Sequence, residues 1–516
     1  MNCKNNLVKG VKAMKKRFRK ALTATLVIAM LSVMLLTSTS VSAYGPLTMY
    51  TPPSSAPSYG VLSPRTVQLK YSGSNNGKMY TTFEECSNGV PTFPIFESTN
   101  NGQTWTKVGD VRDTQNGWGM LNCPQLFEMP QTIGSLTAGT LICAGNSVPG
   151  DRSATRMDLY KSTDLGRTWT FVSRIATGGR HAIEGDPIWE PWFLVANNKL
   201  ICYYSDERDP AHSQKLVHQT TTNGTTWSAV VDDVVWPDST TRPGMPIVVK
   251  LSNGNYMMTY EVVGQSGVPC YAKINNNPET GWNACTSTKI ANGGSSYVTM
   301  LSDGRILAQT YGSGDIYFNT KNDGTGSWVA MGTPTGAAYN RCLLPLSNGR
   351  LFIVCGGGFV APNHNSITYA DMWVPPITGS YRLVNVKSGK VLGINGGSTA
   401  DGAQAVQWTS NGSYDQMWQR VNLTGGYTKL IDVKTSKALG VYQGSTAEGA
   451  KVVQWNDTGA LDQQWTFVAV GSNYKIVNRN SGKCLGVWQG STAEGAELVQ
   501  WTDNGSTDQQ WQLVAN

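Results

Sequence analysis

An acidic residue in aromatic surroundings is the first candidate for chemistry in this chain. Glu190 stands beside Trp189 in an apolar run, and Asp206 follows a second apolar run. The Asn-Asn pair at 197–198 predicts an antiparallel β-hairpin whose open end brings the two acids together. Partial desolvation by aromatic neighbours raises the pKa of a carboxyl group, which suits acid/base or nucleophilic work. The plainer interpretation is a carboxylate that is satisfied by Arg208.

The hairpin belongs to a series of six strand–turn–strand units between residues 61 and 357. Units of about 50 residues built from strands have the size of propeller blades. The sequence therefore predicts an all-β chain with a six-bladed β-propeller. The predicted hairpins are 63–65 with 79–84, 123–126 with 140–144, 186–193 with 200–204, 243–249 with 256–261, 297–300 with 306–311, and 341–344 with 351–355.

Three turn motifs lie between these hairpins, at 98–105, 162–169 and 221–227, and a degraded fourth lies at 322–328. They resemble the aspartate box of sialidase-type propellers, Ser-x-Asp-x-Gly-x-Thr-Trp. The Asp or Asn and the Gly of such a box form a tight turn between the outer strands, and its Trp packs between blades. The motifs indicate a fold rather than a site of chemistry.

Propeller geometry predicts where the chemistry lies. The start of each first strand and the end of each second strand gather at one mouth of the central channel. Carboxylates, arginines and aromatic rings together suit the cleavage of a sugar, with two acids across the glycosidic bond and rings against the sugar faces. The predicted lining residues are Arg65, Glu84, Glu85, Trp189, Glu190, Asp206, Glu207, Arg242, Glu261, Tyr297, Tyr311, Tyr339 and Arg341.

The segments 189–191, 204–209, 242–246 and 258–261 resemble glycoside hydrolase family 93. That family comprises exo-α-1,5-L-arabinanases on a six-bladed sialidase-like propeller, and the resemblance covers about residues 44–376. It implies that Glu190 and Glu261 are the catalytic pair of a retaining mechanism.

We assign Glu190 as nucleophile and Glu261 as general acid/base, with carboxyl groups roughly 5–5.5 Å apart, whereas a gap of roughly 6.5–9.5 Å would favour inversion. The implied substrate is plant cell-wall arabinan or a pectic side chain, released as a mono- or disaccharide, and no cofactor or metal is implied.

Three alternatives remain on the same propeller. A sialidase grips a sugar carboxylate with three arginines, which Arg65, Arg242 and Arg341 would supply, and uses a tyrosine nucleophile, Tyr339 or Tyr311. The second alternative is another exo-glycosidase. The third is a secreted lectin whose propeller is inert.

The composition changes after the segment 375–379, where three copies of about 46 residues follow. Each copy has a Leu-Gly step, a Gly-Ser-Thr-Ala turn, a Val-Gln-Trp strand and a closing Gln-x-Trp. This pattern resembles the ricin-type β-trefoil, also known as carbohydrate-binding module family 13. The resemblance implies that the three Gln-x-Trp tryptophans fill a core around a pseudo-three-fold axis.

Sugar binding by the trefoil requires an acceptor, an aromatic platform and a polar strand residue in a repeat. The first repeat has Asn385 but Ile394 where the ring is expected, so we expect that repeat to be inactive. The alternative is a degenerate trefoil that binds nothing. The predicted contacts are Asp432, Tyr442 and Gln454 in the second repeat and Asn478, Trp488 and Gln500 in the third.

The beginning of the chain has the features of a secretory signal. Eight Lys and Arg residues precede an apolar run at 21–36 and the small-residue sequence Val41-Ser42-Ala43. Loss of residues 1–43 would leave 33 basic and 34 acidic residues, so no basic surface for nucleic acid is expected. The alternative is a membrane anchor, for which the apolar run is short.

These features predict a secreted chain without a membrane partner, expected to be a monomer. Its predicted parts are a signal at 1–43, a propeller at 44–374, a linker at 375–379 and a trefoil at 380–516. Among the ten cysteines, Cys270 and Cys285 flank a loop and are the preferred disulfide pair.

Overall fold

A computed structural model describes residues 44–53, 60–86, 89–346, 350–359, 365–374 and 380–515. The regular structure in these ranges is β-strand, apart from short 3-10 turns. The predicted signal at 1–43 and the predicted linker at 375–379 lie outside the described residues. No helix in the described part of the chain is long and apolar enough to cross a membrane.

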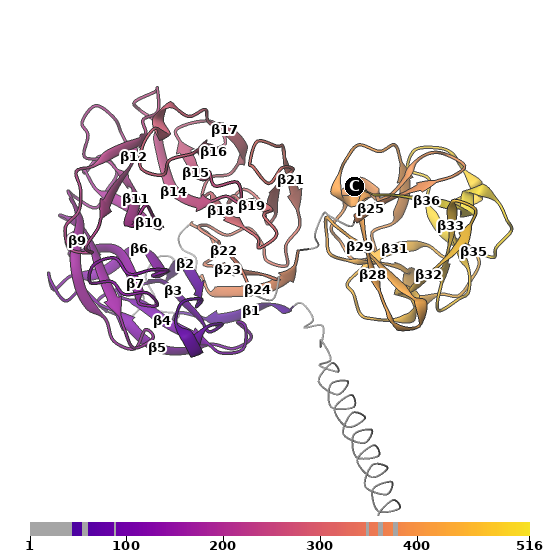
Figure 1. The fold of residues 1–516 in the computed structure, drawn as a ribbon, viewed down its shortest axis with the longest axis horizontal. Coiled ribbons are helices and arrows are strands. Elements are labelled where there is room, and N and C mark those ends of the chain that lie inside the picture. Colours follow the sequence, from indigo (N-terminus) through magenta and orange to yellow (C-terminus); the bar gives the residue numbers. More distant parts are fainter. Residues whose placement is uncertain are drawn as a thin grey trace, which may run out of the picture. The chain divides into compact units, whose positions relative to one another are not determined.

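The first part of the chain is the predicted six-bladed β-propeller, in which six four-stranded antiparallel sheets surround a common centre (Figure 1). Each sheet is a meander, and its first strand lies nearest the centre.

The strands of the six sheets, from the innermost outward, are β2 (Val61–Gln68), β3 (Met79–Glu85), β4 (Phe93–Ser98) and β5 (Thr106–Val111); β6 (Gly119–Glu128), β7 (Leu141–Val148), β8 (Thr155–Ser162) and β9 (Thr170–Gly178); β10 (Ile188–Ala196), β11 (Lys199–Asp206), β12 (Lys215–Thr221) and β13 (Val231–Val234); β14 (Arg242–Lys250), β15 (Tyr256–Val263), β16 (Pro269–Asn275) and β17 (Thr288–Asn292); β18 (Tyr297–Met300), β19 (Ile306–Gln309), β20 (Ile316–Asn319) and β21 (Trp328–Met331); and β22 (Cys342–Pro345), β23 (Arg350–Cys355), β24 (Ile367–Trp373) and β1 (Tyr44–Tyr50).

The ring is closed by a strand from the other end of the propeller sequence. β1 pairs with β24 in an antiparallel ladder and forms the outer edge of the last sheet. The backbone N–H of Tyr44 also donates to Asp371 Oδ1 at 2.9 Å. This closure joins residues more than 300 positions apart and was not predicted from the sequence.

The blades are held together by apolar side chains between neighbouring sheets. Ile201 and Tyr203 of β11 share one buried cluster with Met258 and Tyr260 of β15. A strand that is covered on both faces reads as a continuous apolar run rather than an alternating one. This explains the runs of buried apolar residues in β11 and β15.

The aspartate-box-like motifs form turns between the third and fourth strands, as predicted. In the motif at 162–169, Asp164 Oδ1 accepts from Ser162 Oγ at 2.8 Å and from the Thr168 N–H at 2.9 Å. Trp169 Nε1 donates to the Gly166 carbonyl at 3.0 Å. Gly166 has φ +82°, a left-handed conformation that glycine adopts without a steric cost.

The second part of the chain is the predicted β-trefoil, whose repeats each contribute four strands. The first strand, β25, pairs with the last, β36, which closes the barrel. The strands are β25 (Ser380–Asn385), β26 (Val391–Ile394), β27 (Ala405–Trp408), β28 (Trp418–Asn422), β29 (Thr428–Asp432), β30 (Ala438–Val441), β31 (Val452–Trp455), β32 (Trp465–Val470), β33 (Asn473–Asn478), β34 (Cys484–Val487), β35 (Leu498–Trp501) and β36 (Trp511–Ala515).

The Gln-x-Trp tryptophans fill the trefoil core, which confirms the structural role predicted for them. Trp418, Trp465 and Trp511 are fully buried in one cluster. Each indole N–H donates to the leucine carbonyl of the Leu-Gly step in its own repeat, at 3.2, 2.9 and 3.0 Å respectively. This hydrogen bond fixes the leucine of each Leu-Gly step to the core.

The predicted disulfide between Cys270 and Cys285 is wrong. All nine cysteines in the described part of the chain are free thiols. Cys270 is buried in β16, whereas the Cys285 thiol donates to the Gly281 carbonyl at 3.4 Å. The intervening loop is closed by hydrogen bonds, including one from Asn275 Nδ2 to the Thr280 carbonyl at 2.7 Å.

Candidate active site

Each blade opens with one residue in the left-handed backbone conformation. In the first four blades this residue precedes a proline and lies at a β-bulge in the first strand. A bulge re-aims a side chain, and a non-glycine residue held at positive φ costs on the order of 1–3 kcal/mol. The six residues, with φ between 50° and 60°, are Ser63, Cys123, Glu190, Met245, Ser295 and Asn340.

The backbone N–H groups of these residues bind side chains of the preceding blade. The Cys123 N–H donates to Glu84 Oε1 at 2.9 Å, and the Met245 N–H donates to Glu190 Oε2 at 2.6 Å. The Ser295 N–H donates to Glu261 Oε2 at 2.5 Å. Three carboxylates are thereby anchored around the centre of the propeller by rigid backbone.

Glu190 and Glu261 both lie beside Gly244. A Cβ placed on Gly244 would be 3.5 Å from Glu190 Oε2 and 3.4 Å from Glu261 Oε1. These two distances limit the separation of the two oxygens to about 6.9 Å. Two acids far apart in the sequence therefore lie close enough to act on the two sides of one glycosidic bond.

The two carboxyl groups differ in their electrostatic surroundings. Burial, followed by the charge of Glu190, raises the pKa of Glu261 to about 7. Burial also raises the pKa of Glu190, but hydrogen bonds from Ser205 and Met245 oppose this by stabilising its anion. Glu261 is therefore the carboxyl group that more readily holds a proton, and Glu190 is the one that more readily ionises.

A charged network lies beside the pair. Glu207 accepts from Trp189 Nε1 at 2.7 Å and from Arg242 Nη2 at 2.5 Å, and Arg242 also donates to Gln214 Oε1 at 2.7 Å. The positive charge of Arg242 lowers the pKa of both Glu190 and Glu261. The predicted Trp189 and Arg242 are thus brought to the site, and Glu207 orients both of them.

Tyr339 and Tyr311 also lie at the site. Burial, followed by the charges of Glu261 and Glu190, raises the pKa of Tyr339 well above its ordinary value. The Tyr339 ring packs edge-on against Tyr311, with ring centres 5.9 Å apart, and contacts Phe359 at 4.6 Å. Tyr339 therefore places an aromatic wall and a hydroxyl near both acids.

Asp206 does not join the two glutamates. Its carboxylate is held by Arg208, with Nε at 2.8 Å and Nη2 at 2.6 Å. The plainer interpretation of the hairpin therefore holds for Asp206, whereas Glu190 binds other partners. That Asp206 contacts substrate stays a prediction.

Two other predicted lining residues belong to the interior. Tyr297 is buried against Trp192, and its hydroxyl contacts Cys342 Sγ at 3.4 Å. Arg341 is fully buried and donates to the carbonyl oxygens of Gly314 and Asp315. Their assignment as substrate contacts is therefore corrected: Arg341 satisfies buried backbone and Tyr297 is part of the core.

The arginine grip of a sialidase is not assembled. Arg65 is buried and donates to Gln125 Oε1 and to Asn340, while its guanidinium lies over the Tyr297 ring. Together with the buried Arg341, this leaves Arg242 as the predicted arginine that lies beside the acids. Glu84 lies close to Arg65 and receives the Cys123 N–H, so it is part of the anchored ring.

Sequence reasoning missed several residues of the site. The charges of Glu84 and Glu190 both act on Cys123, which lies between them. His181 Nε2 contacts Asn122 Oδ1 at 2.5 Å, and its ring packs on Trp189 at 4.8 Å. Cys123 could have been found from the sequence, because the first strands of the first four blades each contain a proline, and Cys123 directly precedes one of them.

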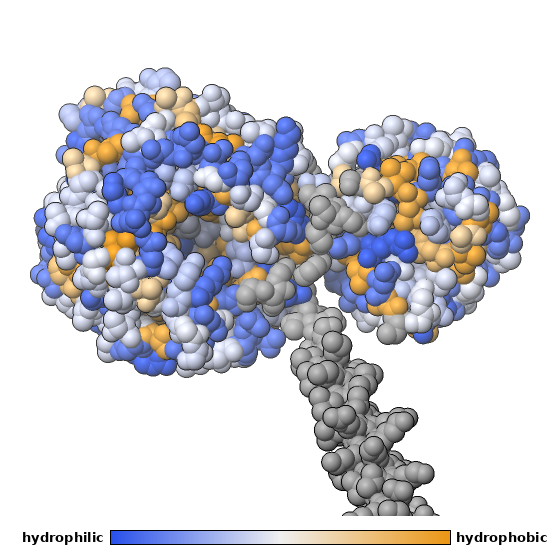
Figure 2. Space-filling view, viewed as in Figure 1, coloured by the Kyte–Doolittle hydropathy of each residue, from blue (hydrophilic) through white to orange (hydrophobic). Residues whose placement is uncertain are grey.

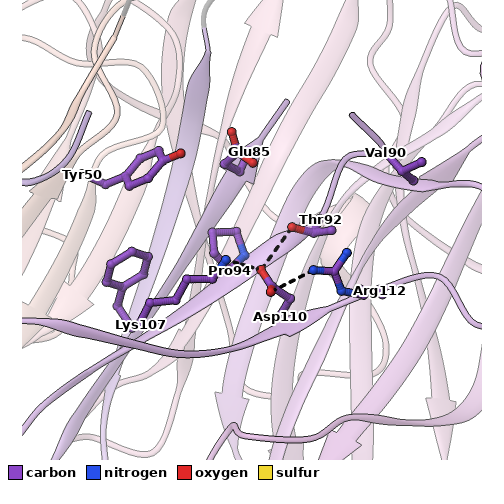
Figure 3. Close-up of a pocket in the computed structure, with 9 residues that line it drawn as sticks. Tyr50, Glu85, Val90, Thr92, Pro94, Lys107, Asp110 and Arg112 are labelled. Atoms are coloured by element: carbon purple, nitrogen blue, oxygen red, sulfur yellow. Dashed lines mark hydrogen bonds and ion pairs between the residues drawn. The ribbon is translucent and has the colours of Figure 1, made fainter. Parts of the chain in front are cut away.

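A small cavity of about 110 Å³ lies on the first blade (Figure 3). Asp110 occupies it and is bound by Thr92, Lys107 and Arg112, so that its charge is matched inside the cavity. Glu85 also lines the cavity, whereas Glu190 and Glu261 do not. In the described residues, no group of three or more His, Cys, Asp and Glu side chains has the arrangement to hold a metal ion.

Four predicted sugar contacts of the trefoil are structural, and their assignment is corrected. They are fully buried and bind backbone or neighbouring side chains of the fold. Gln454 Nε2, for example, donates to the Ser398 carbonyl at 2.7 Å, and Asn478 Nδ2 donates to the Asp462 carbonyl at 2.7 Å. The four residues are Asp432, Gln454, Asn478 and Gln500.

The two predicted aromatic platforms lie at the surface. Tyr442 is 41 % exposed and Trp488 is 40 % exposed. Figure 2 shows apolar residues, in orange, among hydrophilic ones on the visible face of the trefoil. The residue at the same position of the first repeat is Asn395 rather than Ile394, which is buried in the core.

Comparisons with known proteins agree with this architecture. Residues 370–455 and 461–516 match the family described as Ricin-type beta-trefoil lectin domain-like. No curated protein matches the chain.

The chain is similar to the solved structure of an alpha-L-arabinofuranosidase of glycoside hydrolase family 93 from Fusarium graminearum with arabinobiose, at 34 % identity and a TM-score of 0.61. It is also similar to the alpha-L-arabinanase of Penicillium chrysogenum complexed with arabinobiose, at 34 % identity and a TM-score of 0.61. Each comparison covers 64 % of this chain and 98 % of the other. With this identity over nearly the whole relative, the chain belongs to glycoside hydrolase family 93, and it carries a ricin-type β-trefoil lectin domain.

Proposed function

We propose that this glycoside hydrolase is an exo-acting, retaining enzyme that cleaves α-1,5-linked L-arabinan. The observation that carries the proposal is the placement of Glu190 and Glu261 beside Gly244. Both similar enzymes are described with bound arabinobiose, which supports arabinan as the substrate class.

The two carboxyl groups have the properties that a two-step displacement requires. Glu190 attacks the anomeric carbon while Glu261 gives its proton to the departing glycosidic oxygen, which leaves an arabinosyl ester on Glu190. Glu261 then takes a proton from water, and the water oxygen displaces Glu190. Each step inverts the anomeric centre, so that the product keeps the α configuration.

The spacing of the acids supports retention. The limit of about 6.9 Å between one oxygen of each acid is compatible with the roughly 5–5.5 Å between the carboxyl groups of retaining enzymes. The pKa of about 7 for Glu261 lets one group act as acid in the first step and as base in the second.

The trefoil is proposed to hold the enzyme on plant cell-wall polysaccharide. Its exposed Tyr442 and Trp488 rings support this role. The proposal includes export of a monomeric chain after removal of the segment 1–43, on the strength of its basic and apolar composition.

Incubation with linear 1,5-arabinan tests the proposal. The expected result is a short arabinose product that accumulates from the start of the reaction while the polymer shortens slowly. A secreted lectin would adsorb and release nothing, and early production of mid-length fragments would contradict exo action. Sialyl-lactose is the control, since the sialidase alternative predicts its cleavage.

A further inference from the structure

The trefoil surface has a recurring notch where one repeat meets the next. In each notch a glycine of one repeat faces aromatic rings of the following repeat. A Cβ on Gly402 would lie 3.2 Å from Trp455 and 3.7 Å from Tyr442, and one on Gly495 would lie 3.0 Å from Trp408. The rings stay accessible, with 39–43 % of their surface exposed in Trp408, Tyr442, Trp455, Trp488 and Trp501.

The notch between the first and second repeats contains a cavity of about 320 Å³. This volume lies within the range of small-molecule sites. Its walls come from both repeats: Asp401, Gly402 and Gln404 from the first, and Tyr442, Lys451 and Trp455 from the second. The Tyr442 and Trp455 rings meet at 61° with centres 6.4 Å apart, which forms an aromatic corner.

Gln404, which lines the cavity, is held in place by the backbone of all three repeats. Gln404 Nε2 donates to three carbonyls around the pseudo-three-fold axis, those of Ala405, Val452 and Leu498, at 2.9, 3.1 and 2.9 Å. Gln404 Oε1 is buried and has no hydrogen-bond partner among the described residues.

The charges around the cavity cancel. Asp401 is bound by Lys437 at 2.6 Å and by the Asn456 N–H at 3.0 Å. Lys451 is bound by Glu497 at 3.0 Å. The site therefore has no free cation for a uronate or phosphate group, and suits an uncharged ligand with hydroxyl groups and apolar C–H faces.

We propose that this inter-repeat cavity binds one uncharged sugar residue, with a C–H face against the Tyr442–Trp455 corner. The inference deepens the proposed tethering role and rests on it. The binding site thus belongs to the joint between repeats rather than to the buried polar residues of a single repeat.

The other two notches have different residues at the positions equivalent to Gln404 and Tyr442. Cross-repeat bridges place Lys451 and Glu497 where Gln404 stands in the first repeat. The next notch therefore has an ion pair in place of Gln404, and Gly449 lies closer to Trp488, with a Cβ distance of 2.7 Å. The last notch has Asn395 in place of the tyrosine.

Calorimetric titration of the full-length Glu190→Gln chain, which is expected to turn over no substrate, tests the site. The probes are arabinose, galactose and galacturonate. We expect saturable binding of a neutral sugar that Tyr442→Ala weakens by about 10-fold or more and Tyr442→Phe by less than about 3-fold. The matched control Trp408→Ala, at the single-ring notch, is expected to change the affinity by less than about 2-fold.

Several outcomes would overturn the site: no saturable binding of either neutral sugar, equal or tighter binding of galacturonate, or equal losses in Tyr442→Ala and Trp408→Ala. A loss in Tyr442→Phe as large as in Tyr442→Ala would also overturn it, since the ring would then not be the contact. Thermal melting of each variant checks the fold.

A separate assay distinguishes failure of this binding site from failure of the proposed enzyme function. Tyr442→Ala with Glu190 intact is expected to hydrolyse soluble arabinan at the unchanged rate and to lose retention on insoluble arabinan. Absence of hydrolysis in both chains would contradict the proposed function while leaving the titration result as it stands.

Discussion

The propeller and the trefoil both place repeated units around an axis, but they use the repetition in opposite ways. At the left-handed position that opens each blade, the six residues are of five different types, among them Glu190, Met245 and Ser295. At the inter-repeat notch, the trefoil presents nearly the same residues again, such as Trp408, Trp455 and Trp501. Divergence around one axis builds a single asymmetric centre, whereas repetition builds several similar surfaces.

The comparison separates catalysis from adhesion. A reaction needs an acid, a base and an electrostatic difference between them, which only unlike residues at equivalent positions provide. Adhesion to a polymer gains from several weak sites, because linked sites act at a high effective concentration. Changes in the ring of the propeller should therefore affect turnover alone, and changes in the trefoil should affect retention alone.

The largest effect is expected from removing the nucleophile. Glu190→Gln removes the anion that forms the ester, so we expect kcat to fall by about four orders of magnitude or more. Glu261→Gln should lower kcat by about 10²–10⁴-fold. Release of reducing sugar from arabino-oligosaccharides measures both. Adsorption to insoluble arabinan is the control, and its loss in either variant would break the separation of the two domains.

A smaller effect is expected from adding a side chain at Gly244. Gly244→Ala places a methyl group 3.4–3.5 Å from one oxygen of each glutamate and 3.0 Å from Gln214 Nε2. The methyl group occupies substrate space, so we expect kcat/KM to fall by about 10–100-fold with little change in melting temperature. Unchanged kcat/KM would contradict the placement of the scissile bond at Gly244.

The pH dependence should report the electrostatic difference between the two acids. Glu261 must be protonated and its pKa is about 7, so kcat/KM should fall as the pH rises above about 7. Glu190 must be ionised and its pKa is raised, so the rate should also fall on the acid side. A rate profile measured on a soluble oligosaccharide that stays level up to pH 9 would contradict this assignment.

The smallest effect on turnover is expected in the trefoil core. Burial raises the pKa of Asp432 to about 8, and its Oδ2 has no partner among the described residues. The equivalent Asn385 and Asn478 each donate to a backbone carbonyl, at 2.8 and 2.7 Å. A protonated Asp432 supplies the same donor, and this stability is lost as the pH rises through about 8.

Asp432→Asn should therefore remove this pH dependence. The wild-type trefoil is expected to lose about 1.4 kcal/mol of unfolding free energy between pH 7 and 9.5, nearly all of it below about pH 9, and the variant much less. Denaturant unfolding of the full chain, followed through its trefoil transition, measures the difference. Parallel pH curves for the two chains would show that Asp432 is ionised at pH 7. Hydrolysis should be unchanged.

The fold was predictable because its signals are local and repeated. The hairpin of β10 and β11 and the Asp164 turn follow from short patterns of apolar and turn residues. The closing strand β1 did not follow, since its partner is distant in the sequence. The Cys270–Cys285 pair was wrong because loop length alone does not bring two cysteines into bonding geometry.

The site was predictable in its acids and less so in its neighbours. Glu190 and Glu261 were found through a family motif and their place at strand ends. Arg341 and Tyr297 also lie where a first strand begins, but both are buried in the interior. Their strands lack the bulge that the first four blades have at this point. Asp432 and Gln454 were misassigned because polar residues inside a trefoil resemble surface ones in sequence.

The most direct test of the paired glutamates is covalent trapping. An arabinofuranoside with a good leaving group and a fluorine that slows the second step should leave an arabinosyl group on the enzyme. Peptide mass mapping is expected to place it on Glu190, and Glu190→Gln should remain unlabelled. Labelling of Glu261, or an unlabelled enzyme that releases the inverted anomer of arabinose, would contradict the account.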